Sequence, residues 1–206
     1  MKNVVVMGGA FNPPTVAHGR LLGAAMDAAQ AQLGIWLPAS SEYVRRKLGA
    51  GREHELMSDG LRLALVRAAA SEDGRQTVED YELRGAGTGY TVETLEAVAA
   101  AHPGAQLFFL IGSDKLRTLP GWHRADELLS LARLLVVRRG GEDPEELLRE
   151  NPFLAARRER FGVVAFPSGM EHVSSSAVRR LLREGDPRAR DMLPEAVWAL
   201  LRGQDK

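Results

Sequence analysis

The segment from Gly8 to His18 carries residue types and a spacing that suit phosphate chemistry. The two glycines at its start let backbone N–H groups approach a ligand closely, and Thr15 suits the N-cap of a helix whose first turn contains His18. A phosphate at that N-terminus would meet unpaired backbone N–H groups, the positive end of the helix dipole and the imidazole of His18. The alternative is an ordinary turn between a strand and a helix, with a capping threonine and a surface histidine.

A second segment of this kind lies far downstream, at Ser175, Ser176 and Arg179. If Ser175 caps a helix, the backbone N–H groups around it face an anion, and Arg179 lies one turn along on the same side. The alternative is an ordinary capped helix with an arginine on its solvated face.

The elements that must position these residues are strands that alternate with helices. Such alternation indicates an α/β fold with a doubly wound parallel sheet, in which ligands bind beyond the carboxyl ends of the strands. The glycine-rich segment, the segment after Gly112 and the serine-rich segment all follow expected strands. Strands are expected at 4–7, 35–37, 77–83, 107–111, 134–137 and 163–166. Helices are expected at 16–33, 55–70, 92–101, 128–133, 175–183 and 194–201, and a mobile basic loop at 40–52.

Composition limits the function classes. The chain has 206 residues, 27 basic and 27 acidic side chains, and no cysteine. We expect a single domain over 1–206, without disulfides or a cysteine-bound metal, and a cytoplasmic location. The zero net charge argues against nucleic acid as a partner, and the longest apolar runs are too short for a membrane span. The N-terminus is interpreted as a buried strand and not as a signal peptide.

Several motifs together resemble one enzyme family. GGAFNPPTVAH resembles the signature of nucleotidyltransferases with a (H/T)xxH motif, here in the form with Thr15 and His18. VSSSAVRRLLREGDPRARDMLPEAVWALL resembles the ISSTxIR motif and C-terminal helices of nicotinamide/nicotinate mononucleotide adenylyltransferases. FFLIGSDKLRTLPGWHRADELL, GYTVETLEAV and SSEYVRRKLG resemble further segments of that family. The resemblance runs from about Lys2 to Leu201 and implies a Rossmann-like nucleotidyltransferase fold with C-terminal helices over about 174–202.

The resemblance implies the joining of ATP to nicotinate or nicotinamide mononucleotide, with release of pyrophosphate. ATP would bring Mg²⁺, held mainly by phosphates and waters, and we expect no protein ligand for it. The implied catalytic residues are Thr15, His18 and Arg179. The implied ATP-binding residues are Gly8, Gly9, Ala10, Phe11, His18, Gly112, Asp114, Ser175, Ser176 and Arg179. The implied residues for the mononucleotide are Arg45, Thr91 and Trp122.

Alternatives remain open for the weaker positions. Asp114 can be a helix cap, Thr91 can cap the following helix, and Trp122 can be a core residue. Arg46 or Lys47 can take the role given to Arg45. Ala10 stands where relatives often have Ser or Thr, so the backbone must supply that phosphate contact.

The function also has alternatives. One is a related transferase with another acceptor, such as phosphopantetheine, or with CTP as the nucleotide. The other is a nucleotide-binding protein without catalysis. The sequence leaves open the choice between nicotinate and nicotinamide, and a homo-oligomer is compatible with it.

Overall fold

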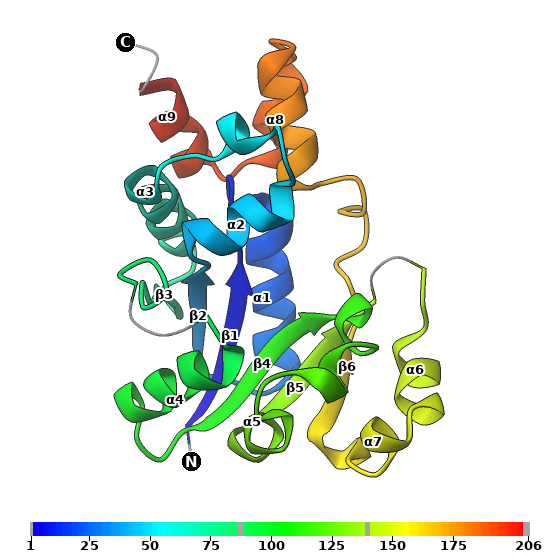
Figure 1. Cartoon of the computed structure of the whole chain (residues 1–206). Helices are drawn as coiled ribbons and strands as arrows, with labels where there is room; N and C mark the ends of the chain where they lie inside the picture. The colour runs from blue at the N-terminus through cyan, green and yellow to red at the C-terminus, as the bar shows by residue number, and fades with distance from the viewer. Residues whose placement is uncertain (1, 86–88, 139–140, 204–206) are drawn as a thin grey trace. The chain divides into compact units, whose positions relative to one another are not determined.

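The computed structural model describes residues 2–85, 89–138 and 141–203. Strands and helices alternate along most of the chain (Figure 1). The strands are β1 (Asn3–Gly9), β2 (Leu33–Pro38), β3 (Gln76–Val78), β4 (Gln106–Gly112), β5 (Ala132–Val137) and β6 (Phe161–Val164). The α-helices are α1 (Val16–Ala28), α2 (Ser41–Leu48), α3 (Asp59–Ala70), α4 (Thr91–Ala101), α5 (Ala125–Leu131), α6 (Pro144–Glu150), α7 (Pro152–Ala155), α8 (Ser175–Arg183) and α9 (Glu195–Gly203). Over the described residues, none of the helices has both the length and the apolar character that a membrane crossing needs.

Short 3-10 helices lie between these elements. They are η1 (Glu53–Glu55), η2 (Ser113–Lys115), η3 (Leu119–Gly121), η4 (Arg158–Arg160) and η5 (Pro187–Met192). Two of them, η2 and η3, follow β4 directly and form the segment that the sequence analysis singled out after Gly112.

The six strands form a sheet in the order β3-β2-β1-β4-β5-β6. β1 pairs with β4, β4 with β5 and β5 with β6, each in parallel, and Val5 lies opposite Phe108. This is the strand order of a doubly wound sheet, so the predicted fold class is confirmed. The order reverses between β1 and β4, and Gly8 and Gly112 lie at the carboxyl ends of these two strands. Ligands bind beyond such ends in doubly wound sheets.

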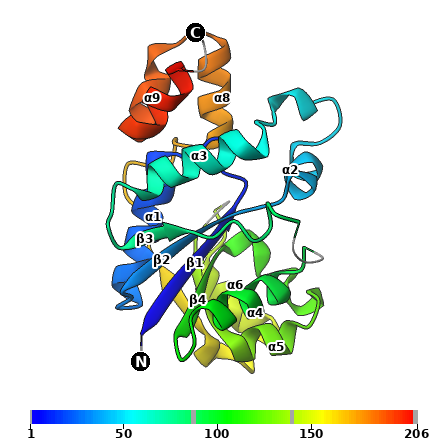
Figure 2. The same ribbon diagram turned by 90° about the vertical axis from the view of Figure 1, so that its left-hand side faces the viewer.

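Two compact units make up the chain. The first unit contains Met1–Gly8, Leu22–Gly34 and Gly87–Phe166, and the second contains Gly9–Leu21, Ile35–Ala86 and Pro167–Lys206. In the first unit β4 and β5 are almost fully buried, and α4 packs against α5. In the second unit α9 packs on α3 (Figure 2). There α8 also packs on η5. Trp36 is fully buried there, and its Nε1 donates to Gln76 Oε1 at 2.8 Å.

The predicted loop at 40–52 is wrong for its first half, which forms α2. The hydroxyl of Ser40 caps this helix by accepting from the Tyr43 N–H, and Val44 is buried on its inner face. The run of basic residues that suggested a loop is the solvated face of the helix. Local capping and one buried contact therefore outweighed the composition of the segment.

The helix predicted over 16–33 is too long, because α1 ends at Ala28. Gln30 has a φ of 50°, and the Ala31 N–H donates to the Met26 carbonyl at 2.7 Å. This is the left-handed ending of a Schellman motif, here formed with glutamine in place of glycine.

Other boundaries differ by a few residues. The strand predicted over 77–83 ends at Val78, and in the turn that follows the Arg84 N–H donates to the Asp80 carbonyl at 3.1 Å. The strand predicted over 163–166 lies two residues earlier, where Phe161 pairs with Leu134. Helices α6 and α7 were not predicted, although Asp143 caps the first of them.

Candidate active site

The loop that leaves β1 is shaped by Phe11. This residue has a φ of 42°, and it is 1% exposed. A Cβ at Gly9 would lie 2.8 Å from the Cζ of Phe11, closer than real Cβ contacts allow. At Gly8 a Cβ would make an ordinary 3.5 Å contact with the Phe109 ring. Glycine at position 9 is therefore required by the packing of Phe11 and needs no ligand to explain it.

Thr15, directly before α1, and His18 in its first turn form a polar pair. The Thr15 N–H donates to His18 Nδ1 at 3.1 Å, and Thr15 Oγ1 lies 2.7 Å from the same nitrogen. Because a backbone N–H can only donate, Nδ1 is an acceptor and the imidazole carries its proton on Nε2. The Phe11 ring lies edge-on to the imidazole, with 5.2 Å between centroids. The pair therefore makes Nε2–H the hydrogen-bond donor of this ring.

The N-terminus of α8 is capped by Ser174, and the prediction that Ser175 is the cap is wrong. The Ser174 hydroxyl accepts from the Ala177 N–H at 3.2 Å, because Ser174 has extended backbone just before the helix. Ser175 is the first helical residue, and its hydroxyl donates to the Pro13 carbonyl at 2.8 Å. Ser175 thus ties the start of α8 to the loop after β1.

Arg179 binds three groups in the second unit. Its Nε donates to Glu55 Oε2 at 2.9 Å, its Nη1 to the Asn12 carbonyl at 2.9 Å and its Nη2 to Ser176 Oγ at 3.4 Å. The residue is 8% exposed. Arg179 and Ser175 together bring the glycine-rich loop and the serine-rich segment side by side, although 167 residues separate Asn12 from Arg179.

Glu55 is a residue of this cluster that the sequence analysis did not identify. Its side chain is 7% exposed, and it pairs with Arg52 at 2.9 Å, Arg179 at 2.9 Å and Arg183 at 3.0 Å. The hydrogen bond from Arg52, followed by that from Arg179, lowers the pKa of Glu55 from its usual 4.5 to about 2. Nothing in the local sequence marked this carboxylate, since Arg179 lies 124 residues away.

Asn12 holds the same segment through its side chain. Its Nδ2 donates to the Glu55 carbonyl at 2.8 Å, and its Oδ1 accepts from the Met57 N–H at 2.9 Å. Asn12 is 1% exposed. Because Asn12 also binds Arg179 through its carbonyl, it fixes Glu55 and Arg179 relative to the loop after β1.

Arg62 supports the loop from a fully buried position, and it too was not predicted. Its Nη1 donates to the carbonyls of Ala10 at 3.0 Å and Ala39 at 2.8 Å, and its Nη2 pairs with Asp59. Burial raises the pKa of Asp59, but the hydrogen bonds from Ser41 and Arg62 outweigh it, and the net shift is downward. The Ala10 carbonyl therefore points to Arg62.

Arg45 lies on α2, not on a loop. It is exposed in the last turn of the helix, together with Arg46 and Lys47. The positive charge of Arg45 contributes to the lowered pKa of Asp59, after the groups that contact Asp59 directly. The three basic side chains thus extend from one short, capped helix.

Gly112 and Asp114 lie in the first unit, at and just after the end of β4. Asp114 is the second residue of η2, with a side chain that is 38% exposed and 3.3 Å from Lys115 Nζ. The N-cap of η2 is Gly112, so Asp114 is not a cap. Ser113 between them is fully buried.

Thr91 and Trp122 also belong to the first unit. Thr91 is the first residue of α4 and the N-cap position is Tyr90, so the alternative of Thr91 as the cap is wrong. Trp122 is half-buried at the end of η3, and its Nε1 donates to Thr118 Oγ1 at 3.2 Å.

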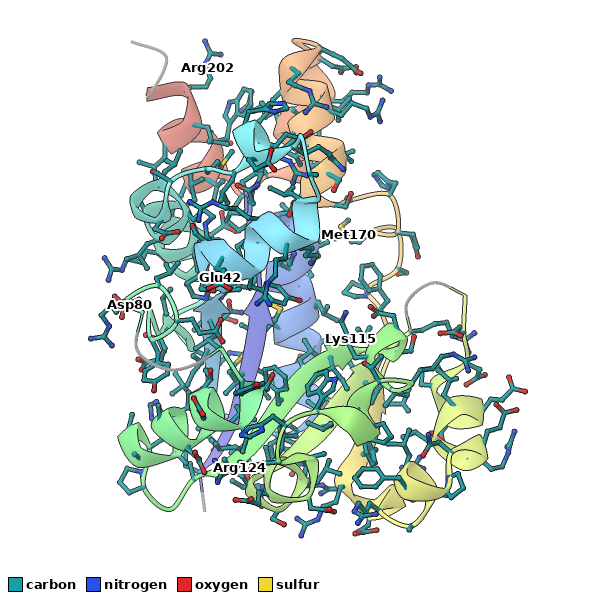
Figure 3. The ribbon with its side chains drawn as sticks, in the orientation of Figure 1. Glu42, Asp80, Lys115, Arg124, Met170 and Arg202 are labelled. Carbon is teal, nitrogen blue, oxygen red and sulfur yellow. The ribbon has the colours of Figure 1, made fainter. Side chains whose placement is uncertain are left out.

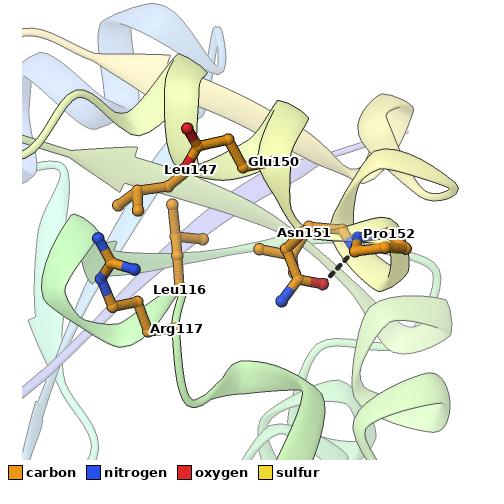
Figure 4. A pocket seen from close by; sticks show the side chains of 7 residues that line it. Leu116, Arg117, Leu147, Glu150, Asn151 and Pro152 are labelled. Carbon is orange, nitrogen blue, oxygen red and sulfur yellow. Dashed lines mark hydrogen bonds between the residues drawn. The ribbon is translucent and has the colours of Figure 1, made fainter.

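A pocket of about 310 Å³ lies elsewhere in the first unit (Figure 4). On one wall of the pocket Asn151 Oδ1 accepts from the Leu154 N–H at 3.3 Å. The pocket is lined by Leu116, Arg117, Leu147, Glu150, Asn151, Pro152 and Leu154. None of the residues predicted for the site is among them.

The predicted site residues thus divide between the two units. The structure brings one set together through hydrogen bonds and ring contacts around the loop after β1. The second unit holds Gly9, Ala10, Phe11, Thr15, His18, Arg45, Ser175, Ser176 and Arg179. The first unit holds Gly8, Thr91, Gly112, Asp114 and Trp122.

Comparison with known proteins identifies the family of the chain. Residues 6–181 match the family model described as cytidylyltransferase-like. The probable nicotinate-nucleotide adenylyltransferase of Gloeobacter violaceus is 34% identical, over 93% of this chain and 89% of the relative. The probable nicotinate-nucleotide adenylyltransferase of Gemmatimonas aurantiaca is 32% identical, over 93% of this chain and 86% of the relative.

Solved structures show the same fold. The nicotinic acid mononucleotide adenylyltransferase of Plasmodium falciparum, complexed with NaAD, has a TM-score of 0.75 at 18% identity. This match covers 100% of this chain and 97% of the other. The same Plasmodium enzyme complexed with APC has a TM-score of 0.74 at 17% identity, over 100% and 96% of the two chains. From the family match and the identities over nearly its full length, the chain belongs to the cytidylyltransferase-like family and, within it, to the nicotinate-nucleotide adenylyltransferases.

Proposed function

We propose that the chain joins ATP and nicotinate mononucleotide to form nicotinate adenine dinucleotide and pyrophosphate. The observation that carries the proposal is the pair of Thr15 and His18, in which Nδ1 is occupied and Nε2–H is the donor. Relatives at 32–34% identity that are named for nicotinate nucleotide support nicotinate over nicotinamide as the acceptor. ATP enters with its Mg²⁺, which is bound by phosphates and waters, and we name no protein ligand for the ion.

The reaction needs no nucleophile from the protein. An oxygen of the mononucleotide phosphate forms a bond to the α-phosphorus of ATP, and the bond from that phosphorus to the oxygen bridging to the β-phosphate breaks. Pyrophosphate leaves with the electron pair of that bond. The protein then contributes positioning and neutralisation of the charge that builds on the phosphates. We assign His18 Nε2–H to an α-phosphate oxygen, and Thr15 to holding the ring in this tautomer.

We assign the β- and γ-phosphates to the N-terminus of α8. The backbone N–H groups of Ser175 and Ser176 are at the first two helical positions, which have no partner within a helix. The Ser175 hydroxyl is bonded to the chain itself, so its backbone N–H is the group that we assign. Among the described residues, Arg179 engages three of its five N–H groups, and we assign the other two to the phosphates.

The next assignment concerns the backbone at the carboxyl end of β1 and in the loop that follows. We assign the backbone of Gly8, Gly9, Ala10 and Phe11 to the phosphates of ATP. For Gly9 and Ala10 these contacts come from N–H groups, because the Gly9 carbonyl accepts from the Ala39 N–H and Arg62 binds the Ala10 carbonyl.

Five further residues complete the assignment. Gly112 and Asp114 are assigned to the nucleotide, where the carboxylate binds a sugar hydroxyl or a nearby amide. Thr91 and Trp122 are assigned to the pyridine ring and Arg45 to the mononucleotide phosphate, because an aromatic face suits a flat ring and an exposed guanidinium suits a phosphate.

A pyrophosphate-release assay tests the proposal. The chain is incubated with ATP or CTP and Mg²⁺, each with nicotinate mononucleotide, nicotinamide mononucleotide or phosphopantetheine. We expect the fastest release with ATP and nicotinate mononucleotide, with one dinucleotide formed per pyrophosphate. Fastest release with CTP or with phosphopantetheine would identify a transferase with another substrate. ATP binding without turnover on any pair would identify a nucleotide-binding protein.

The cytoplasm is the location that we propose, and a homo-oligomer is proposed as well. Light scattering during size-exclusion chromatography tests the oligomeric state.

A further inference from the structure

An exposed aromatic stack joins α4 to the segment Thr118–Arg124, here called the Trp122 loop. The rings of Tyr90 and His123 lie 4.1 Å apart between centroids, with 27° between their planes. Tyr90 is 48% exposed and stands directly before α4, and His123 follows Trp122. Rings that remain exposed while stacked bury little apolar area. Their contact therefore contributes more to the position of the Trp122 loop than to the core.

Arg124 joins the same elements by ion pairs. Its Nη2 lies 2.7 Å from Glu96 Oε1 on α4 and 2.5 Å from Glu127 Oε2 on α5, and its Nη1 donates to Glu96 Oε2 at 3.2 Å. Arg124 lies between these two helices (Figure 3). Its φ is 53°, in the left-handed region that is unfavourable for residues other than glycine and that is kept where surrounding contacts enforce it.

Trp122 lies immediately before these two anchors. Its Nε1 donates to Thr118 Oγ1 at 3.2 Å, which closes the Trp122 loop on itself. The indole is half-buried, and its Nε1 edge is held by the protein. Trp122, the stacked His123 and the ion-paired Arg124 are thus three consecutive residues.

We propose that His123 and Arg124 are positioning residues, which hold the Trp122 loop on the first two turns of α4 and thereby set the affinity for the pyridine mononucleotide. The inference rests on the proposed function, in which Thr91 and Trp122 bind that substrate. A loop fixed in advance does not have to be ordered when the mononucleotide binds. Its release therefore weakens mononucleotide binding, and it leaves ATP binding and the chemical step unchanged.

The test compares His123→Ala, Arg124→Met, His123→Phe and Trp122→Ala in the full chain with one matched control. His123→Ala and Arg124→Met should each raise KM for nicotinate mononucleotide about 2- to 10-fold, the range expected for a lost aromatic stack or ion pair. KM for ATP and kcat should stay near the wild-type values. His123→Phe keeps a stacking ring and should restore KM. Arg157→Met is the control, because the Arg157 side chain is 33% exposed like that of Arg124 and pairs with Asp126 on the same helix α5.

Three results would overturn the inference. In the first, Trp122→Ala raises KM for the mononucleotide but His123→Ala and Arg124→Met do not, which leaves the proposed function intact. In the second, both variants lower Tm and change kcat and both KM values together, as a merely structural role would. In the third, Trp122→Ala itself has no effect on KM, which removes the assignment of Trp122. The proposed reaction is then judged separately by the pyrophosphate-release assay.

Discussion

Replacement of His18 separates the roles of its two ring nitrogens. His18→Ala removes both, His18→Asn keeps a polar group near the position of Nδ1, and His18→Gln places an amide N–H near the position of Nε2. Because Nδ1 binds Thr15 and Nε2–H is assigned to the α-phosphate, His18→Gln should retain more activity than His18→Asn. His18→Asn should resemble His18→Ala.

The contacts of the His18 ring set the expected losses of kcat and of stability. Loss of a donor to charge that builds in the transition state lowers kcat by about 10²–10³-fold, and we expect this for His18→Ala. Thr15→Val removes the hydroxyl at 2.7 Å and keeps the backbone N–H at 3.1 Å. One net hydrogen bond is worth about 0.5–1.5 kcal/mol, so Thr15→Val should lower kcat by roughly 2- to 13-fold. Phe11 loses its edge-on contact in His18→Ala, which should cost about 0.5–1.5 kcal/mol of stability.

The assay is initial-rate pyrophosphate release with saturating ATP and nicotinate mononucleotide, accompanied by thermal unfolding of each variant. Two results would refute the reasoning. Near-wild-type kcat in His18→Ala would remove His18 from the chemistry. Higher activity in His18→Asn than in His18→Gln would mean that Nδ1, not Nε2, is the nitrogen that matters.

Three further predictions concern the buried cations and the carboxylate of the second unit. Arg62→Met leaves two carbonyls without their donor and should lower the free energy of unfolding by about 2–6 kcal/mol in urea titration, while Arg67→Met on the same helix should cost less than about 1 kcal/mol. Equal losses in both variants would contradict the role of Arg62. Glu55 has its pKa lowered to about 2 by hydrogen bonds from Arg52 and then Arg179, so its contribution to stability is present above about pH 4.5 and is lost as the pH falls toward 2. Glu55→Gln should therefore flatten the pH dependence of the free energy of unfolding in that window, and an unchanged slope would count against it. Arg179→Ala should raise KM for ATP more than KM for the mononucleotide and lower Tm, because it removes three hydrogen bonds within the protein. Calorimetric titration with unchanged ATP affinity would limit Arg179 to a structural role.

Segments with a strong local signal were predicted well. The apolar run at 107–111 forms most of β4, and 175–183 is α8 with the same boundaries. Boundaries that depend on a partner strand or a special backbone conformation were displaced. β6 is placed by its register with β5, and α1 ends where Gln30 takes a left-handed conformation. The helix α2 was missed because one buried side chain, Val44, decided its fold against a basic composition.

The site residues also divide into those with a local signal in the sequence and those with distant partners. The placement of Thr15 and His18 at one helix start was evident from their spacing, because residues three apart there lie in one turn. Ser175 was correctly placed near the helix start, but the cap is Ser174, since a serine on either side of a helix boundary can cap it. Glu55 was missed because its partners lie far from it in the sequence.

The sequence by itself determined the family, the alternation of strands and helices, and the placement of Thr15 and His18 at the start of one helix, while their hydrogen bond came from the structure. These depend on periodicity, on motif order and on contacts within one turn. Only the tertiary structure decided that Arg179 binds Asn12 and that Arg62 binds the Ala10 carbonyl. Such contacts join residues that lie far apart in the chain. Which residues become partners depends on the packing of the whole unit and not on neighbours in the chain. Because any arginine can bind any carbonyl or carboxylate that the fold brings within reach, the residue types alone do not identify the pairs.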